Sequence, residues 1–261
     1  MLRLGGTASQ DHVEAFEALT AIFRKRGIDM DWVLYSGYDA LVEAFVSGEV
    51  DMAWNGPLSY VKIRRLMNNP ARVIAMRDVD VDFVTHFITH RDSEVRAVSD
   101  LAGRRFAFGS RGSVQAGLLP HHYLKEMGID PGSELSTFTF HGDRAGGPAY
   151  DEQDVVERVA NGTYDAGAVS DLTLKAVQAR PDQAPIRVFW SSPGYSHCCF
   201  TVHGDLDPVL LEDVERAFLS VDPHDPDGKV LLEAEACNSI VAGTEEGWDV
   251  VERAAEDEGL I

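Results

Sequence analysis

A histidine and two cysteines stand next to one another in the run His197-Cys198-Cys199-Phe200. Imidazole nitrogen and thiolate sulfur are good ligands for transition metals, and a histidine beside a cysteine can also activate a thiolate nucleophile. Successive side chains of a strand point to opposite faces, so only one of the two cysteines can face a binding site. The run leaves two interpretations open: metal-binding or reactive chemistry, or a buried and inert cysteine pair.

Two further histidines, His86 and His90, lie in the β-rich segment 83–90. Their even spacing would place them on one face of a strand. We consider His86 together with His197 and Cys199 for a transition metal, and expect no other cofactor. The alternative is that these histidines are solvated or packed. The sequence contains no Walker loop, no GxGxxG fingerprint, no HExxH and no GxSxG.

A glycine- and serine-rich loop precedes one of the predicted helices. It is formed by Gly109, Ser110, Arg111, Gly112 and Ser113. Free backbone N–H groups, the positive end of the helix and a serine hydroxyl can together hold an anionic group. The loop therefore predicts an anion site, and its alternative is an ordinary strand-to-helix turn capped by serine.

Charged side chains gather near a second polar loop, at residues 141–150. Asp143, Glu152 and Asp171 could favour an amine or a zwitterion, and Arg144 could bind a carboxylate through two parallel hydrogen bonds. A solvated acidic loop is the alternative.

Aromatic side chains with a polar tip suit a cleft that closes over a small ligand. In the first part of the chain, Tyr38, Trp54 and Tyr60 are such residues, and Asn55 stands beside them. Trp54 could equally belong to the core at the end of a strand. These four residues are our ligand-contact candidates for this part of the chain.

Short strands and helices alternate and must position these residues. The helix expected at 11–26 carries Val13, Phe16 and Leu19 at helical spacing, and Gly27 ends it. Further helices are expected at 39–45, 57–67, 113–127 and 155–160 and over much of 208–261, and strands at 2–4, 30–35, 50–54, 72–76, 83–90, 105–108, 136–140, 165–169, 186–190 and 199–203. This rhythm predicts an α/β protein with mostly parallel pairing and helices on both faces.

The pattern restarts after 83–90, which indicates two lobes, each a mixed sheet flanked by helices. Lobe 1 is expected to comprise 1–85 and 200–261 and lobe 2 to comprise 86–199, with hinge crossings near 83–90 and 195–203. In open α/β sheets ligands bind beyond the carboxyl ends of strands. Those ends are predicted at 54–57, 109–113, 141 and 170–171, so that two loops from each lobe could face a shared cleft.

Three groups of segments, in order and spacing, cover nearly the whole chain. They are 38–45 with 48–53 and 55–60; 99–109 followed by 119–131; and 159–162 with 165–169. Together they resemble the phosphate/phosphite/phosphonate substrate-binding family of ABC transporters, which has the type 2 periplasmic-binding-protein fold. The resemblance implies a small polar, anionic or zwitterionic ligand in a cleft between two lobes that close by hinge motion.

The chain departs from the family pattern in two places. The family usually has a hydroxyl-rich run after the position of Ser113, whereas this chain has Val114 and Gln115. The family also commonly has a histidine near the position of Glu152. A carboxylate beside a phosphonate costs free energy unless it is protonated or paired, so the departures favour an amine-bearing or zwitterionic ligand.

The chain is acidic, with 43 Asp and Glu against 23 Lys and Arg and a formal charge of −20. This charge opposes nucleic-acid binding, and no apolar stretch is long enough for membrane insertion. The N-terminal residues do not resemble a signal peptide, and three cysteines do not suggest a disulfide framework. We therefore expect a cytoplasmic protein. An ABC permease partner and a periplasmic or extracellular location are expected only if a signal has been removed.

A competing hypothesis is a cytosolic enzyme on the same fold, such as a decarboxylase, a dehydratase or a protein like thiamin pyrimidine synthase. The last of these carries a CCCFC run, which Cys198-Cys199-Phe200 resembles in part. If this chain is such an enzyme, the candidates for catalytic residues are His197, Cys198, Cys199 and Glu152.

Overall fold

The computed structural model describes residues 1–67 and 71–261, which form two compact α/β units. Unit 1 comprises 1–82, 195–252 and residue 261, and unit 2 comprises 83–194 and 253–260. The predicted fold class, with a mixed sheet flanked by helices in each unit, is confirmed. The two internal boundaries fall after residues 82 and 194, a few residues before the predicted ones at 85 and 199. Residues 253–260, which were predicted to belong to lobe 1, are part of unit 2.

The sheet of unit 1 has six strands in the order β11-β4-β10-β3-β1-β2. Strand β1 pairs in parallel with β2 and β3, whereas β10 runs antiparallel between β3 and β4. The strands are β1 (Leu2–Thr7), β2 (Met30–Tyr35), β3 (Met52–Asn55), β4 (Arg72–Arg77), β10 (Cys199–Val202) and β11 (Ile240–Ala242).

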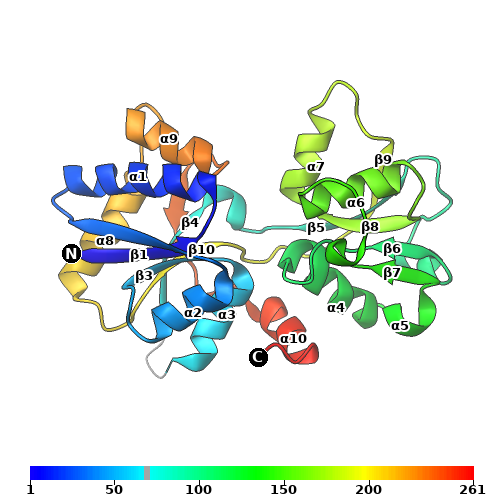
Figure 1. Cartoon of the computed structure of the whole chain (residues 1–261), viewed down its shortest axis with the longest axis horizontal. Helices are drawn as coiled ribbons and strands as arrows, with labels where there is room; N and C mark the ends of the chain where they lie inside the picture. The colour runs from blue at the N-terminus through cyan, green and yellow to red at the C-terminus, as the bar shows by residue number, and fades with distance from the viewer. Residues whose placement is uncertain (68–70) are drawn as a thin grey trace. The chain divides into compact units, whose positions relative to one another are not determined.

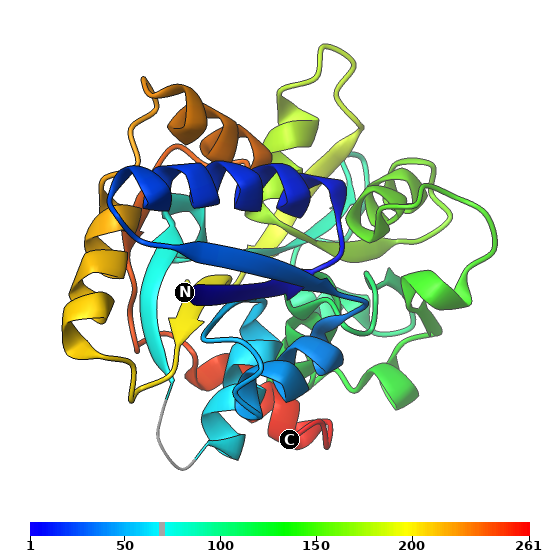
Figure 2. The same cartoon turned by 60° about the vertical axis from the view of Figure 1, so that its left-hand side comes forward.

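Helices cover both faces of this sheet. Helices α1 (Gln10–Lys25), α8 (Pro208–Leu219) and α9 (Pro226–Ala234) contribute to one buried apolar cluster, and α2 (Tyr38–Val46) and α3 (Pro57–Leu66) to another. Figures 1 and 2 both show α1 and α9 side by side, above the strands of unit 1. The last helix, α10 (Asp249–Asp257), is divided between the two units.

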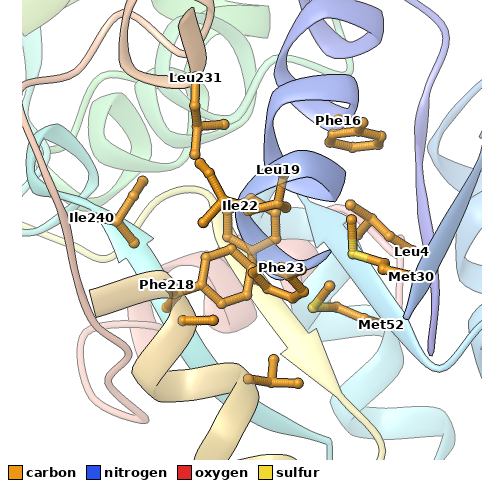
Figure 3. Close-up of a cluster of buried hydrophobic side chains, with 14 of the residues drawn as sticks. Leu4, Phe16, Leu19, Ile22, Phe23, Met30, Met52, Phe218, Leu231 and Ile240 are labelled. Carbon is orange, nitrogen blue, oxygen red and sulfur yellow. The ribbon is translucent and has the colours of Figure 1, made fainter. Parts of the chain in front are cut away.

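Helix α1 illustrates how the sequence determines these elements. Ser9 caps its first turn by accepting the N–H of His12, and Arg24 and Lys25 complement the negative end of the helix dipole. Its apolar residues recur at helical spacing and are buried. Figure 3 shows Phe16, Leu19, Ile22 and Phe23 clustered with the strand residues Leu4, Met30 and Met52.

The sheet of unit 2 has five strands in the order β7-β6-β8-β5-β9. Strand β5 is antiparallel to both of its neighbours, and β6 is parallel to both of its own. The strands are β5 (Thr85–His90), β6 (Arg105–Ala107), β7 (Thr137–Thr139), β8 (Ala166–Ser170) and β9 (Ile186–Ser191), and the helices are α4 (Leu119–Glu126), α5 (Pro131–Glu134), α6 (Asp151–Ala160) and α7 (Asp171–Gln178).

Three differences from the predicted elements affect the candidate residues. Helix α6 begins at Asp151, four residues before the predicted start, because its first turn is stabilised by acidic side chains that carry no apolar periodicity. The helix after the loop 109–113 opens with a π-helical turn, Val114–Leu118, before α4. Strand β3 ends at Asn55, which places this residue inside the sheet. Within 1–67 and 71–261, no helix combines the length and apolarity needed to cross a bilayer.

Candidate functional site

In unit 1, two helices begin at glycines beyond the carboxyl ends of strands. Gly37 precedes α2 and Gly56 precedes α3, and neither N-terminus receives a side-chain cap. The ring of Tyr38 lies so close to Gly56 that a Cβ there would stand 3.2 Å from it. Tyr38 is 46% exposed and hydrogen bonds with Thr7 at the end of β1. This edge therefore offers an exposed phenol and the positive ends of two helices.

The other first-half candidates are buried. Trp54 stacks on Phe200 with ring centroids 4.2 Å apart, and the Tyr60 hydroxyl donates to Glu245 Oε2 at 2.6 Å. Asn55 donates through Nδ2 to the Thr201 hydroxyl. Strand β3 is buried on both faces because it lies between β1 and β10 and under helices. Trp54 and Tyr60 therefore belong to the core, and Asn55 keeps an Oδ1 without a partner among the described residues.

A buried polar cluster, which sequence reasoning found only in part, lies in unit 1 near the unit boundaries. Asp80 accepts hydrogen bonds from Arg77 Nε at 2.5 Å and Nη2 at 2.9 Å. The Nδ1 atom of His197 lies 3.1 Å from Asp80 Oδ1 and 3.1 Å from Cys198 Sγ. Arg77 Nη1 also lies 3.6 Å from Oε2 of the buried Glu235. Asp80, Arg77 and Glu235 were not predicted, because only the His-Cys-Cys run has a local signature.

The two adjacent cysteines have different positions. Cys199 is in β10, opposite Asn55 of β3, and is fully buried. Cys198 precedes the strand and faces His197. Burial raises the pKa of both thiols well above the usual range, and the Asp80 carboxylate adds to this effect at Cys198. Neither cysteine is therefore a thiolate near neutral pH.

In unit 2, the loop 109–113 is tightly constructed. The Ser113 hydroxyl accepts the N–H of Ala116, and the Ser113 carbonyl accepts the N–H groups of Gly117 and Leu118, both at 2.9 Å. A Cβ at Gly117 would stand 2.2 Å from the Ser110 carbonyl oxygen, so the loop backbone packs directly on the π-helical turn. Ser113 is the N-cap of this helix, as the alternative interpretation of the loop expects.

Gln115 and Glu152, the two departures from the family pattern, contact each other. Gln115 Nε2 donates to Glu152 Oε1 at 2.9 Å. The other carboxylate oxygen, Oε2, accepts both the N–H and the hydroxyl of Ser170 at 2.7 Å. Ser170 in turn caps α7 by accepting the N–H of Thr173. Glu152 is buried, and both of its oxygens have partners within unit 2.

The two arginines of the polar loops have different roles. Arg111 is exposed, donates to Asp143 Oδ2 at 2.7 Å and covers the ring of Phe140 at 4.1 Å. Arg144 is buried, and its donors contact Asp154 and the carbonyls of Thr139 and Phe108.

The predicted carboxylate clamp at Arg144 is therefore replaced by a structural role within unit 2. The remaining candidate of this unit, Asp171, starts α7. Its pKa would be raised by burial, but the hydrogen bonds from Lys175 and His86 outweigh burial and lower it.

The predicted metal candidates are divided between the two units. His86 is in unit 2, where its Nδ1 lies 2.8 Å from the Ser191 hydroxyl and its Nε2 lies 3.4 Å from Asp171. His197 and Cys199 are in unit 1, and Cys199 belongs to β10. Over the described ranges, the one cluster with three such ligand groups joins His197 to Cys198 and Asp80, with all ligand atoms within 4.8 Å of one another.

Comparison with known proteins places this geometry in context. Residues 7–248 match the family model described as "ABC transporter, phosphonate, periplasmic substrate-binding protein". A probable ABC transporter phosphite-binding protein, PhnD1 of Prochlorococcus marinus, is 28% identical over 204 residues. That match covers 74% of this chain and 65% of the relative, so less than two thirds of the relative's length is spanned. The phosphate-import protein PhnD of Mycolicibacterium smegmatis is 26% identical over 93% of this chain and 77% of its own length.

Solved structures share the fold. The structure of Prochlorococcus marinus PhnD1 in complex with methylphosphonate matches with a TM-score of 0.75 and 22% identity, covering 100% of this chain and 98% of that one. XAC2383 from Xanthomonas citri, bound to ATP, matches with a TM-score of 0.74 and 18% identity over 98% of both chains.

Proposed function

Because the chain belongs to the family of phosphonate-type substrate-binding proteins of ABC transporters, we propose that it binds one small phosphonate-type anion. The observation that carries this proposal is the loop 109–113, which opens a helix at a serine cap in unit 2. Related proteins are named for phosphite and for phosphate, and one related structure holds methylphosphonate. These oxyanions share a tetrahedral group of acceptor oxygens.

The physical argument rests on donors and on helix ends. A chain with a net charge of −20 repels an anion at long range, so binding requires a local source of positive potential. The positive end of the helix that Ser113 caps is one such source in unit 2. Unit 1 by itself offers the uncapped starts of α2 and α3, beside which the ring of Tyr38 lies.

The neighbouring acids refine the choice of ligand. Gln115 and Glu152 stand where the resemblance would give a hydroxyl and a histidine, and Asp171 starts the next helix. Both oxygens of Glu152 have protein partners, so its effect on a ligand is that of a nearby negative charge. We therefore propose that the ligand carries an amine besides its oxyanion.

Isothermal titration calorimetry on the full chain tests the proposal. Methylphosphonate and aminomethylphosphonate differ by a single amino group, so their comparison isolates the amine. We expect the protein to bind both compounds and to bind aminomethylphosphonate more tightly. Ser113→Ala should lower the affinity for each compound by about tenfold, which corresponds to the loss of one hydrogen bond to a charged group. Ser133→Ala, at an exposed serine of α5, is the matched control. Equal affinity of Ser113→Ala and the parent protein would contradict the role of the loop.

Hinge closure on the ligand stays a prediction from the sequence. Small-angle X-ray scattering with and without methylphosphonate measures it directly, and an unchanged radius of gyration at saturation would refute it. The cytoplasmic location is likewise a proposal, and fractionation of the native source tests it. A permease partner is proposed only for a protein found outside the cytoplasm.

The competing enzyme hypothesis depended on an activated thiol. Catalytic cysteines have lowered pKa values, whereas burial raises the pKa of both Cys198 and Cys199. Glu152, the other catalytic candidate, has both oxygens engaged by Gln115 and Ser170. The electrostatics of these residues therefore favour binding over nucleophilic catalysis.

A further inference from the structure

The cluster of Asp80, His197 and Cys198 is held in place by the backbone. Asp80 ends the short turn after β4, and the other two residues directly precede β10. The N–H of His197 donates to the carbonyl of Asp80 at 3.0 Å, which ties the two segments together within unit 1. All three side chains are buried or nearly so. Their spacing is therefore fixed before any ligand arrives.

Two of the three distances between the ligand atoms are close to those of a metal site. Oxygen, nitrogen and sulfur ligands of a tetrahedral zinc ion lie about 3.3–3.6 Å from one another, given bonds of about 2.0–2.3 Å. Here His197 Nδ1 lies 3.1 Å from both Asp80 Oδ1 and Cys198 Sγ, and all three atoms lie within 4.8 Å of one another.

His197 Nδ1 lies between the other two possible ligand atoms, with a carboxylate oxygen on one side and a sulfur on the other. With a proton, Nδ1 donates to Asp80; without one, its lone pair can accept the thiol proton or bind a cation. The arrangement therefore places three possible donor atoms around one position.

Two acids and one guanidinium surround the three ligand atoms. Arg77 lies 2.5 Å from Asp80 and 3.6 Å from Glu235. Arg77 donates to both oxygens of Asp80, through Nε to Oδ2 and through Nη2 to Oδ1, and such outer partners commonly orient a metal-binding carboxylate. Glu235 is 4% exposed, and its Oε1 has no partner among the described residues.

We propose that Asp80, His197 and Cys198 form a binding site for one divalent transition-metal ion of the Zn²⁺ type. Mixed carboxylate, imidazole and thiolate donors suit zinc and cobalt better than magnesium or calcium, which prefer oxygen ligands. Three protein ligands leave a fourth position for water or for a solute. The three ligands are in unit 1 and the loop 109–113 is in unit 2, so the metal proposal uses none of the loop's residues and extends beyond the proposed phosphonate binding.

Cobalt substitution tests the proposal on the full chain, with any purification tag removed and no phosphonate present. Co²⁺ bound by a thiolate gives an ultraviolet charge-transfer band, and tetrahedral geometry gives intense visible bands. We expect both to saturate at one equivalent per chain and to be abolished by Zn²⁺. Cys198→Ser should remove the charge-transfer band and weaken zinc binding by more than about 100-fold, the upper range for loss of an outer partner alone.

Cys237→Ser is the matched control, because Cys237 is a partly exposed free cysteine of the same unit. It should leave the band and the zinc affinity unchanged. Protection of Cys198 from a thiol reagent by zinc, followed by peptide mass spectrometry of the parent protein, needs no variant and remains informative if Cys198→Ser does not fold. Absence of the band in the parent protein, its survival in Cys198→Ser, or zinc uptake without saturation would overturn the proposal.

Discussion

The carboxylate of Glu152 accepts two hydrogen bonds from Ser170, one from the backbone N–H and one from the hydroxyl, each at 2.7 Å. The first turn of α6 is thereby attached to the start of α7, because Ser170 also caps α7. A residue singled out for ligand binding thus also organises the helix ends of unit 2.

Truncation of Glu152 should destabilise the protein. Glu152→Ala leaves the buried Ser170 N–H without an acceptor and also releases Gln115, so we expect a loss of about 3 kcal/mol in the free energy of unfolding. Urea denaturation measures this loss from the midpoint at constant m. Glu157→Ala, at an exposed position of the same helix, should change the free energy by no more than about 0.5 kcal/mol. Equal midpoints for the two variants would contradict the structural role.

A milder change at the same residue should alter ligand choice. Glu152→Gln removes the negative charge but keeps an oxygen acceptor of similar shape for Ser170. We expect methylphosphonate to bind more tightly and aminomethylphosphonate more weakly than in the parent protein, since the charge repels the first ligand's oxyanion and attracts the second ligand's amine. Titration calorimetry of both ligands checks the ratio of the two affinities. An unchanged ratio would show that Glu152 does not influence the ligand.

The sequence predicted the elements of this chain better than their long-range pairs. Ser113 has the local signature of a helix cap, and the structure places it there. The contact of Glu152 with Ser170 joins residues 18 positions apart, and no periodicity encodes such a pair. Trp54 was ambiguous because a strand end can face either a ligand or the core, and β10 decides the matter by pairing with β3.

The adjacent cysteines show the same limit. Alternation along a strand predicted that only one of the two cysteines could face a binding site, but Cys198 is not part of the strand. The register of β10 starts at Cys199, so Cys198 is left before the strand and close to Asp80. Asp80 was missed because it lies in a turn after β4, and only the folded chain brings it to residue 197.

The buried ion-pair cluster around Asp154 should make the protein sensitive to acid. Burial alone would raise the pKa of Asp154, but hydrogen bonds from Arg158, Arg144 and His141 outweigh burial and lower it. A lowered folded-state pKa contributes stability that is present above the unfolded value of about 4 and is lost as the pH falls through the folded value.

Asp154→Asn should therefore cost about 3 kcal/mol at neutral pH, because it leaves the buried Arg144 without its counter-charge. The difference from the parent protein should begin to shrink as the pH falls below about 4, where the carboxylate of the unfolded chain is protonated, and should disappear below the lower pKa of the folded state. Urea midpoints measured across this pH range test the prediction. A difference that stays constant at low pH would show that the charge of Asp154 is not the stabilising factor.

Glu235 should have the opposite pH dependence. Burial raises the pKa of this carboxyl from 4.5 to about 7, although Arg77 counteracts part of the effect. A raised folded-state pKa means that the stability contribution is complete below the unfolded value and is lost as the pH rises through the folded value. The parent protein should therefore lose about 3 kcal/mol from this group between the two values, as a shift of this size implies.

Glu235→Gln cannot ionise, so the free energy of unfolding of the variant relative to the parent should rise by the same amount over that pH range. The measurement requires a chelator, because a cation bound by Cys198 and its neighbours would favour the ionised carboxylate. Glu233→Gln, two residues away and exposed, is the matched control and should give a pH profile parallel to that of the parent. If the Glu235→Gln profile is parallel as well, the buried carboxyl ionises without cost, and the positive charge of Arg77 must then compensate its burial in full.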